Sequence, residues 1–213
     1  MGLYLCASHH IYFKTRLLTF IFQRGDILLE KRTLINNILN GDMESFSLLV
    51  QAYQGQLYNF IYKMTNSKED TEDILQEVFV KVYNNLYKYN DNFRFSTWIY
   101  SITVNTVKSS YKKKKCRPSS YFIDGLIEEI SSSDNDPELI MEVKEHYTKI
   151  IEVIDGLKEK QKTAIILRFL KNFTYEEIGN IMGISQEAAK MKVHRAKTIL
   201  AEKLKNMKKK GVL

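Results

Sequence analysis

The chain has 213 residues, a length that suits two small domains, and its 32 Lys and Arg against 25 Asp and Glu give a formal charge of +7 at pH 7. Its hydrophobic share of 44% excludes wholesale disorder, and no apolar run is long enough to predict a membrane span. Only 2 prolines and 9 glycines favour long helices, and 2 scattered cysteines outside any metal-binding spacing are typical of a reducing cytosol. We therefore expect a cytoplasmic, helical protein whose basic charge points weakly to a polyanionic partner.

Residues 1–26 precede the first clear helical pattern. Lys14 and Arg16 interrupt an apolar stretch within them, and no convincing small-residue cleavage site follows. The adjacent His9 and His10 have no third ligand near them, so they do not predict a metal site. We expect this stretch to be a disordered or non-native N-terminal extension that does not contribute to the fold.

The chain then reads as a succession of helices. Asn40-Gly41-Asp42 predicts a helix end followed by an N-cap, because Gly ends a helix at little cost and Asp accepts hydrogen bonds from free N–H groups. Apolar residues spaced by threes and fours over 46–64 predict one buried helix face. Ser67 predicts the cap of a third helix, 90–92 a loop, and a fourth helix runs from about 96 to 114.

A change of composition divides the chain. The segment that begins at Pro118 carries seven acids before the next Lys or Arg, together with a Ser, Asp and Asn run typical of linkers. We therefore expect a first domain over 27–117, a flexible acidic linker over 118–137, a second domain over 138–205 and a basic tail over 206–213. The predicted fold class is all-α, with two small helical domains.

The sharpest local pattern begins at Thr174 and predicts a helix-turn-helix. Thr174 and Glu177 have the spacing of a capping box, Gly183 supplies a turn that permits positive φ, and Ser185 caps the next helix. Gly179 is small where the second helix must cross closely. A helix-turn-helix places its second helix in the major groove of DNA. An ordinary helical hairpin with a solvated charged face is the alternative.

The outward face of that second helix carries groups that can reach base edges or phosphates. It consists of Gln186, Glu187, Lys190, Met191, His194 and Arg195. Glu187 repels phosphates, so if the helix docks on DNA we expect this carboxylate to face a base or to point away.

A basic run at the end of the fourth helix follows a group of aromatic residues. The cations are Lys108, Lys112, Lys113, Lys114, Lys115 and Arg117, and the aromatic side chains upstream are Phe93, Phe95, Trp98 and Tyr100. Bases stack on rings while cations follow the backbone, so this combination suits single-stranded DNA. Some of these rings must belong to the core, Trp98 before the others, and a solvated helix end is the simpler alternative for the lysines.

Taken in order, these segments resemble the sigma-70 family, extracytoplasmic-function (ECF) group. The resemblance spans about residues 34–205 and rests on GDMESFSLLVQAYQGQLYNFIYKMT, DTEDILQEVFVKVYNNL, FSTWIYSITVNTVKSSYKKKK and, after the acidic linker, LKEKQKTAIILRFLKNFTYEEIGNIMGISQEAAKMKVHRAK. It implies a sigma region 2-like helical bundle and a sigma region 4-like helix-turn-helix domain.

The resemblance also implies roles for individual residues. Contact with core polymerase falls on Asp70, Asp73, Gln76, Glu77 and Lys81. Contact with the −10 element falls on Asn92, Arg94, Trp98, Asn105, Lys108 and Lys112, with Asn105 at the position that helps to capture a flipped base. Contact with the −35 element falls on Gln186, Lys190, Met191, His194 and Arg195.

The implied function is that of a sigma factor, which directs core RNA polymerase to promoters and promotes DNA opening. The implied partners are the clamp helices and flap of core polymerase, duplex and melted promoter DNA and, as in many members, an anti-sigma factor. No cofactor or metal is expected. A stand-alone helix-turn-helix regulator and a sigma-like decoy remain as alternatives, whereas an enzyme lacks support because no phosphate loop, metal-ligand cluster or nucleophile elbow occurs.

Overall fold

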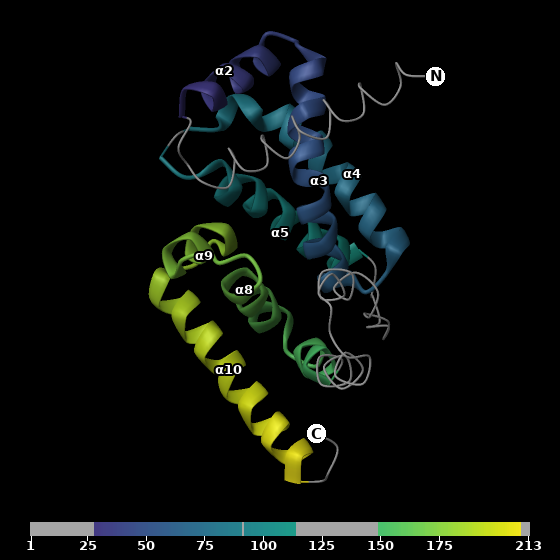
Figure 1. The fold of residues 1–213 in the computed structure, drawn as a ribbon, viewed down its shortest axis with the longest axis vertical. Coiled ribbons are helices and arrows are strands. Elements are labelled where there is room, and N and C mark those ends of the chain that lie inside the picture. The colour runs from purple at the N-terminus through teal and green to yellow at the C-terminus, as the bar shows by residue number, and fades with distance from the viewer. Residues whose placement is uncertain (1–27, 91, 114–148, 210–213) are drawn as a thin grey trace, which may run out of the picture.

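The computed structural model describes residues 28–90, 92–113 and 149–209, and these residues are helical with no strand, which confirms the all-α prediction (Figure 1). The expected N-terminal extension and the acidic linker lie outside the described residues. The elements are α2 (Leu28–Leu39), α3 (Met43–Thr65), α4 (Lys68–Asn85), the 3-10 turn η1 (Leu86–Lys88), α5 (Phe95–Lys113), α8 (Glu159–Phe169), α9 (Tyr175–Met182) and α10 (Gln186–Lys209).

The predicted caps set the borders of α3 and α4. The Asp42 carboxylate accepts hydrogen bonds from the Ser45 hydroxyl (2.6 Å) and the Ser45 backbone N–H (3.4 Å), and these bonds lower the pKa of Asp42. Asn66 ends α3 in the left-handed conformation with φ 53°, which Asn tolerates better than most residues. The Ser67 hydroxyl then accepts from the Asp70 N–H at 3.2 Å and starts α4. The chain therefore turns sharply between the two helices.

The first domain is built around α3. Its buried side chains meet those of α4 and α5, so that three helices enclose one apolar core. Fully buried members are Leu49, Leu57, Phe60 and Ile61 from α3, Val78 and Val82 from α4, and Phe95 and Ile99 from α5. One face of α4 and one face of α5 point away from this core. These two faces therefore remain available to hold functional side chains.

The second domain packs α8, α9 and α10 together through small and branched residues. Ala164 and Leu167 of α8, Ile178 of α9, and Ala189 and Val193 of α10 are fully or almost fully buried. The helix α10 continues to Lys209, beyond the end at residue 205 that we expected for this domain. None of the described helices has the length and apolar character needed to cross a bilayer.

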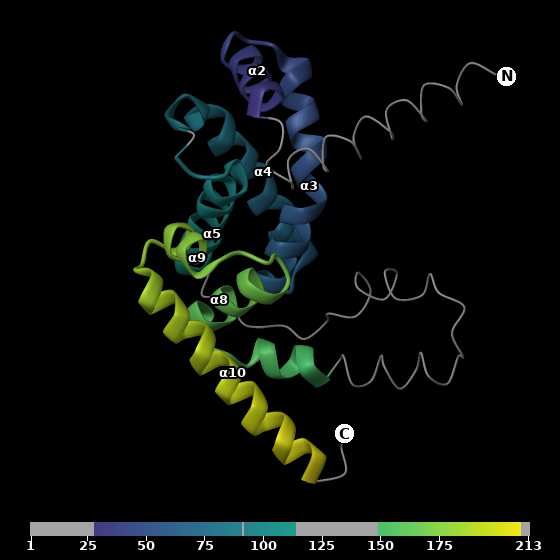
Figure 2. The same cartoon turned by 60° about the vertical axis from the view of Figure 1, so that its left-hand side comes forward.

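The two domains share a continuous core, which the sequence did not predict. Figures 1 and 2 both show α9 against α5, and the Tyr100 and Phe173 rings meet edge to face with centroids 5.1 Å apart. Both rings are buried. Burial raises the pKa of the Tyr100 phenol above its usual range, since the charged form loses hydration. The helix expected to open DNA therefore lies directly beside the helix-turn-helix.

Candidate nucleic-acid interface

The helix-turn-helix forms as its local pattern predicts. The Thr174 hydroxyl accepts from the Glu177 N–H (3.2 Å), and the Thr174 N–H donates to the Glu177 carboxylate (2.8 Å), which confirms the capping box. Gly183 ends α9 with φ 65°, and the Ser185 hydroxyl accepts from the Ala188 N–H at 3.1 Å. These caps fix where α9 ends and α10 begins, and so fix which face of α10 points outward.

Gly179 sets how closely α9 and α10 approach. A Cβ at this position would lie 2.8 Å from the Ile184 carbonyl oxygen, a distance that real side chains do not reach. The Ile184 N–H also donates to the Gly179 carbonyl at 2.9 Å. The prediction that this residue must be small is therefore confirmed by backbone contact.

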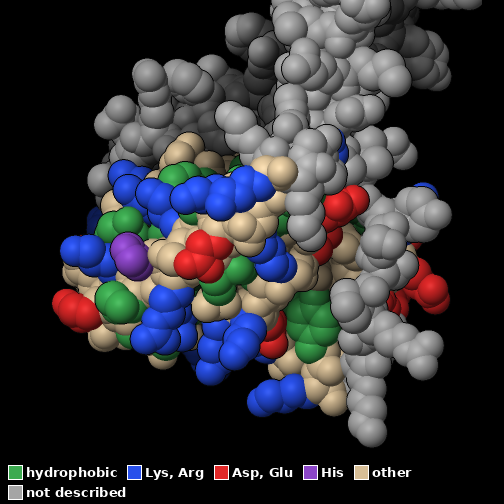
Figure 3. Space-filling view, turned by 90° about the horizontal axis from the view of Figure 1, so that it is seen from below, with side chains coloured by type: hydrophobic (Ala, Val, Ile, Leu, Met, Phe, Trp, Pro, Cys, Tyr) green, Lys and Arg blue, Asp and Glu red, His purple; other side chains and the backbone are tan. Residues whose placement is uncertain are grey.

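The outward face of α10 places the predicted duplex-contact residues side by side in solvent. All five predicted residues are exposed: Gln186, Lys190, Met191, His194 and Arg195. Glu187 is exposed as well. Figure 3 shows Lys and Arg side chains gathered on this end of the molecule, with a histidine among them. This convex, cationic helix face has the shape and charge that a major groove requires.

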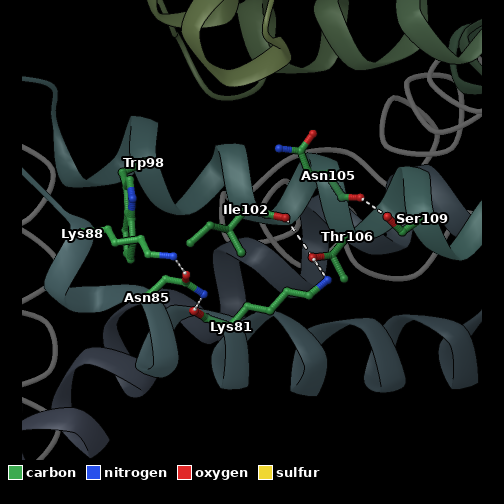
Figure 4. A pocket seen from close by; sticks show the side chains of 8 residues that line it. All are labelled: Lys81, Asn85, Lys88, Trp98, Ile102, Asn105, Thr106 and Ser109. Atoms are coloured by element: carbon green, nitrogen blue, oxygen red, sulfur yellow. Dashed lines mark hydrogen bonds between the residues drawn. The ribbon is translucent and has the colours of Figure 1, made fainter.

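A second cationic site lies between α4 and α5, where a groove of about 310 Å³ opens (Figure 4). Its lining residues are Lys81, Asn85, Lys88, Trp98, Ile102, Asn105, Thr106 and Ser109. The groove therefore combines two lysines, two amides and one half-buried indole. This set can hold a phosphate and a flat ring at the same time.

Hydrogen bonds order the α4 wall of the groove. Lys81 Nζ donates to the Thr106 hydroxyl (3.2 Å) and lies 2.7 Å from the Glu77 carboxylate. Lys88 Nζ donates to the Asn85 side-chain oxygen at 3.0 Å, while the Asn85 amide donates to the Lys81 carbonyl at 2.8 Å. Both ammonium groups are thus held on one wall by neighbours that leave them partly exposed.

The opposite wall belongs to α5, which carries Asn105 and Trp98. Asn105 is exposed, and its amide points away from Lys81 in Figure 4. The Trp98 ring packs against Tyr89 and Phe95, with centroids 5.5 and 5.3 Å apart. Trp98 is therefore partly structural, as expected, while one side of it still forms the end of the groove.

The other aromatic side chains divide between the core and the surface. Phe95 and Tyr100 are buried and cannot stack on a base, whereas Phe93 is 47% exposed. The Tyr89 hydroxyl donates to the Phe93 carbonyl at 3.0 Å, which ties the loop before α5 to the aromatic cluster. Of the four aromatic residues that the sequence suggested for base stacking, Phe93 and Trp98 are accessible.

The remaining predicted −10 residues do not line this groove. Asn92 and Arg94 are exposed in the loop before α5, and one Arg94 guanidinium nitrogen lies 3.7 Å from the Glu177 carboxylate of α9. Lys108 is half-buried and Lys112 exposed further along α5. The structure therefore collects these cations along one helix and its preceding loop.

The predicted polymerase-contact residues of α4 fall on two sides of the helix. Asp73 and Gln76 are exposed on its outer face, whereas Glu77 and Lys81 are half-buried on the side of the groove. Asp70 lies in the first turn beside the Ser67 cap. Lys81 thus lies in the groove together with Asn105, although the sequence analysis grouped it with the polymerase contacts.

Two sets of accessible residues were not predicted from the sequence. Val80, Tyr83 and Tyr87 are 59%, 41% and 66% exposed. Val80 and Tyr83 continue the outer stripe of α4 that Asp73 and Gln76 begin, and Tyr87 follows in η1. Counting by threes and fours from Asp73 finds them, but apolar residues in such a series are normally assigned to the core. Asn85 and Lys88 were missed because only the neighbouring helix makes them part of a groove.

The described residues contain no group of three or more His, Cys, Asp or Glu side chains able to hold a metal ion. These residues form a helical protein with two cationic surfaces, an arrangement suited to binding nucleic acid. Comparison with known proteins identifies the family.

A family model of sigma-70 region 2 matches residues 49–117, and a model of sigma-70 region 4 matches residues 147–200. The chain is 28% identical over 191 residues to the ECF RNA polymerase sigma factor SigW of Bacillus subtilis, covering 85% of this chain and 100% of the relative. It is 31% identical over 186 residues to the ECF RNA polymerase sigma-E factor of Escherichia coli, covering 83% and 95%. The chain therefore belongs to the sigma-70 family of RNA polymerase sigma factors, in its ECF group.

Solved structures share the fold. CnrH in complex with the cytosolic domain of CnrY matches with a TM-score of 0.59 and 17% identity, covering 82% of this chain and 97% of that chain. The sigma factor RpoE in complex with the anti-sigma factor NepR from Bartonella quintana matches with a TM-score of 0.60 and 20% identity, covering 76% and 98%. At these identities the likeness concerns the helical fold alone.

Proposed function

We propose that this chain binds core RNA polymerase, directs it to promoters and opens the DNA, with a separate task for each accessible face. The domain over 27–117 contacts polymerase and the −10 element, and the domain over 138–205 contacts the −35 element. The observation that carries the proposal is the α4–α5 groove, which two lysines, Trp98 and Asn105 line, on a chain that also presents a helix-turn-helix.

The outer face of α4 is the proposed polymerase-docking surface. It joins an acidic and amide end, formed by Asp73 and Gln76, to an apolar end formed by Val80 and Tyr83 and continued by Tyr87 of η1. Exposed aromatic residues next to polar ones are typical of protein interfaces, since their burial supplies free energy and the polar rim supplies orientation. Asp70 and Glu77 add negative charge near this surface.

The groove is the proposed site for an unstacked base of the −10 element. Trp98 offers a ring, Asn105 offers a donor and an acceptor, and Lys81 and Lys88 offer charge for the adjoining phosphates. We therefore move Lys81 from the polymerase contacts to the groove. Arg94, Lys108 and Lys112 add positive charge along the loop and α5, and Asn92 adds an exposed amide to the loop.

A free-energy comparison explains why polymerase is required. Disrupting ten base-pair steps costs about 14 kcal/mol at a mean of about 1.4 per step. Capturing two bases by stacking returns only about 2–6 kcal/mol. The difference has to come from a larger assembly that holds bent and unwound DNA, so the chain acts as a subunit rather than as a solitary DNA opener.

The test is run-off transcription with purified bacterial core polymerase on a pool of promoter fragments, with and without this protein. The Asn105→Ala variant removes an amide that lines the groove. The control variant, Asn59→Ala, removes an exposed amide from α3. We expect Asn105→Ala to reduce promoter melting about 5- to 150-fold, the equivalent of about 1–3 kcal/mol for a lost amide contact to a base edge, while polymerase binding is unchanged. Asn59→Ala should behave as the wild type.

Each other outcome has a distinct meaning. Equal loss of melting and polymerase binding in Asn105→Ala would show that Asn105 is structural. Polymerase binding without any initiation would favour a sigma-like decoy, and tight duplex binding without polymerase binding would favour a stand-alone regulator.

A further inference from the structure

The outward face of α10 has cations at its two edges. At about 100° per residue, Lys190 and Arg195 lie about 140° apart around the helix. Over 186–195, the sector between them holds three exposed side chains, those of Glu187, Met191 and His194. The core contacts of α10 lie on the opposite side, at Ala189, Val193 and Ala196. The middle of the outward face is therefore a stripe without lysine or arginine over this part of the helix.

This order matches the cross-section of a major groove. The groove is about 12 Å wide and a helix with its side chains is about 10–12 Å across, so a docked helix fills it. Residues at the edges of the outward face then meet the two phosphate walls, and residues in the middle meet the base edges on the floor. Lys190 and Arg195 suit the walls, because each can hold a phosphate oxygen.

Glu187 favours the same placement of the middle stripe. A carboxylate against a phosphate wall would add repulsion, whereas on the floor of the groove it can accept a hydrogen bond from the amine of a cytosine. Glu187 lies in the first turn of α10, one turn before Met191 on the same stripe. The N-terminal residues of a recognition helix are the ones that contact base edges. If the stripe faces bases, Met191 faces them as well.

Met191 is the apolar member of this stripe, and it is 49% exposed. Figure 3 shows hydrophobic surface beside the histidine, among the basic side chains. A thioether has no hydrogen-bond donor and is only a weak acceptor, so against a base edge it gains most from contact with an apolar group. In the major groove that apolar group is the C5 methyl group of thymine.

We propose that Met191 determines base preference in the −35 element by packing against the C5 methyl group of one thymine. The proposal deepens the proposed function and rests on it for the identity of the element that α10 contacts. It concerns one base pair, at which thymine is preferred to uracil, because uracil presents the same hydrogen-bonding atoms without the methyl group. Lys190 and Arg195 add attraction that does not depend on sequence.

The test starts from selected binding sites. The full chain selects duplexes from a random DNA pool, once bound to core polymerase and once alone. Each thymine of the selected upstream element is then replaced in turn by deoxyuridine, and binding is measured by competition. The protein change is Met191→Ala, which shortens an exposed side chain and leaves the buried face of α10 untouched. The DNA change and the protein change together form a double-mutant cycle.

Met43→Ala is the matched control. Met43 is the first residue of α3 and is 56% exposed, so this variant removes the same side chain at a similar exposure from the other domain. It should depend on each thymine as the wild-type chain does. Circular dichroism checks that both variants keep their helical content.

We expect deoxyuridine at one position to weaken wild-type binding about fourfold, the effect of uncovering one methyl-sized group. Met191→Ala should lose at least this factor on the thymine duplex and should not distinguish thymine from uracil at that position. Sites selected by this variant should lose the preference for thymine there alone. The slope of log K against log salt concentration should keep its wild-type value, because no phosphate contact is removed.

Two results would overturn the assignment of Met191. If no deoxyuridine substitution weakens wild-type binding, α10 contacts no thymine methyl group. If the loss persists unchanged in Met191→Ala, another side chain contacts that group. Failure of the proposed function looks different, because the chain alone would then select a sequence and respond as described, while the chain mixed with core polymerase would initiate no transcription from it. Selection of no sequence under either condition would remove base readout from α10.

Discussion

The α9–α10 pair and the α4–α5 pair both present cations, but with opposite shapes. On α10 the side chains stand apart on a convex surface, and all five predicted contact residues are exposed. Between α4 and α5 the cations line a groove, where Lys81 and Lys88 are held by Glu77, Thr106 and Asn85. A convex helix fits the groove of a duplex, whereas a concave site fits a single unstacked nucleotide.

The two sites also differ in how many helices are needed to hold their side chains in place. The α10 face needs only correct helix ends, so a change there alters charge and leaves the fold intact. The groove needs two helices in register, so its lysines also serve as packing and hydrogen-bonding groups. The contrast predicts that charge removal on α10 acts almost entirely on DNA binding, while changes in helix packing act on stability.

The largest effect is expected from Lys190→Ala combined with Arg195→Ala. Loss of two contacts should weaken binding to the upstream promoter element by about 2–6 kcal/mol. It should also reduce the slope of log K against log salt concentration by the amount expected for about two phosphate contacts. Footprinting of the polymerase–promoter complex at several salt concentrations measures both quantities. Unchanged upstream protection would refute the role of these residues.

The matched control is Lys203→Ala combined with Lys205→Ala. This pair removes the same charge from exposed positions further along the same helix. It should leave upstream protection close to the wild-type level. An equal loss in both pairs would mean that α10 attracts DNA through its total charge, without a docking face.

A smaller effect tests the packing of α9 against α10, with a glycine of α3 as a contrast of opposite sign. Gly179→Ala should destabilise the protein by about 1–3 kcal/mol, because the added Cβ meets the Ile184 carbonyl across the α9–α10 turn. Gly55→Ala should stabilise it by about 0.5–1 kcal/mol, since no atom lies within 4 Å of that Cβ and Ala favours a helix. Urea unfolding monitored by circular dichroism measures both. A stabilising Gly179→Ala would mean that the turn is looser than its 2.9 Å hydrogen bond from Ile184 indicates.

The features that could be predicted from the sequence depend on interactions between residues close together along the chain. Asp42, Ser67 and Thr174 cap helices through partners two or three residues away, so their roles were readable in order along the chain. The exposed position of Lys190 followed from those caps. All of these interactions are local.

The rest depended on partners distant in sequence. Lys81 meets Thr106 across 25 positions, and Asn66 meets Asp155 across 89. No spacing rule links such residues, so neither the groove nor the junction between domains could be predicted. Phe95 and Tyr100 show the same limit, because an aromatic residue near a basic run has no pattern that separates a stacking ring from a core ring.

The smallest expected effect concerns the outer face of α4. Neither the shape nor the charge of the two cationic sites bears on this face. Tyr83 packs on Phe46 with ring centroids 5.0 Å apart, whereas Tyr87 is 66% exposed and lies near Lys88. Tyr87→Ser should therefore weaken polymerase binding roughly five- to tenfold through loss of an interface aromatic, with little change in stability. Competition for core polymerase against the unlabelled wild-type chain measures the loss, and Asn59→Ser, at an exposed position of α3, should show none. If Tyr87→Ser bound polymerase normally but failed in promoter melting, Tyr87 and η1 would belong with the groove, and the polymerase surface would be confined to α4.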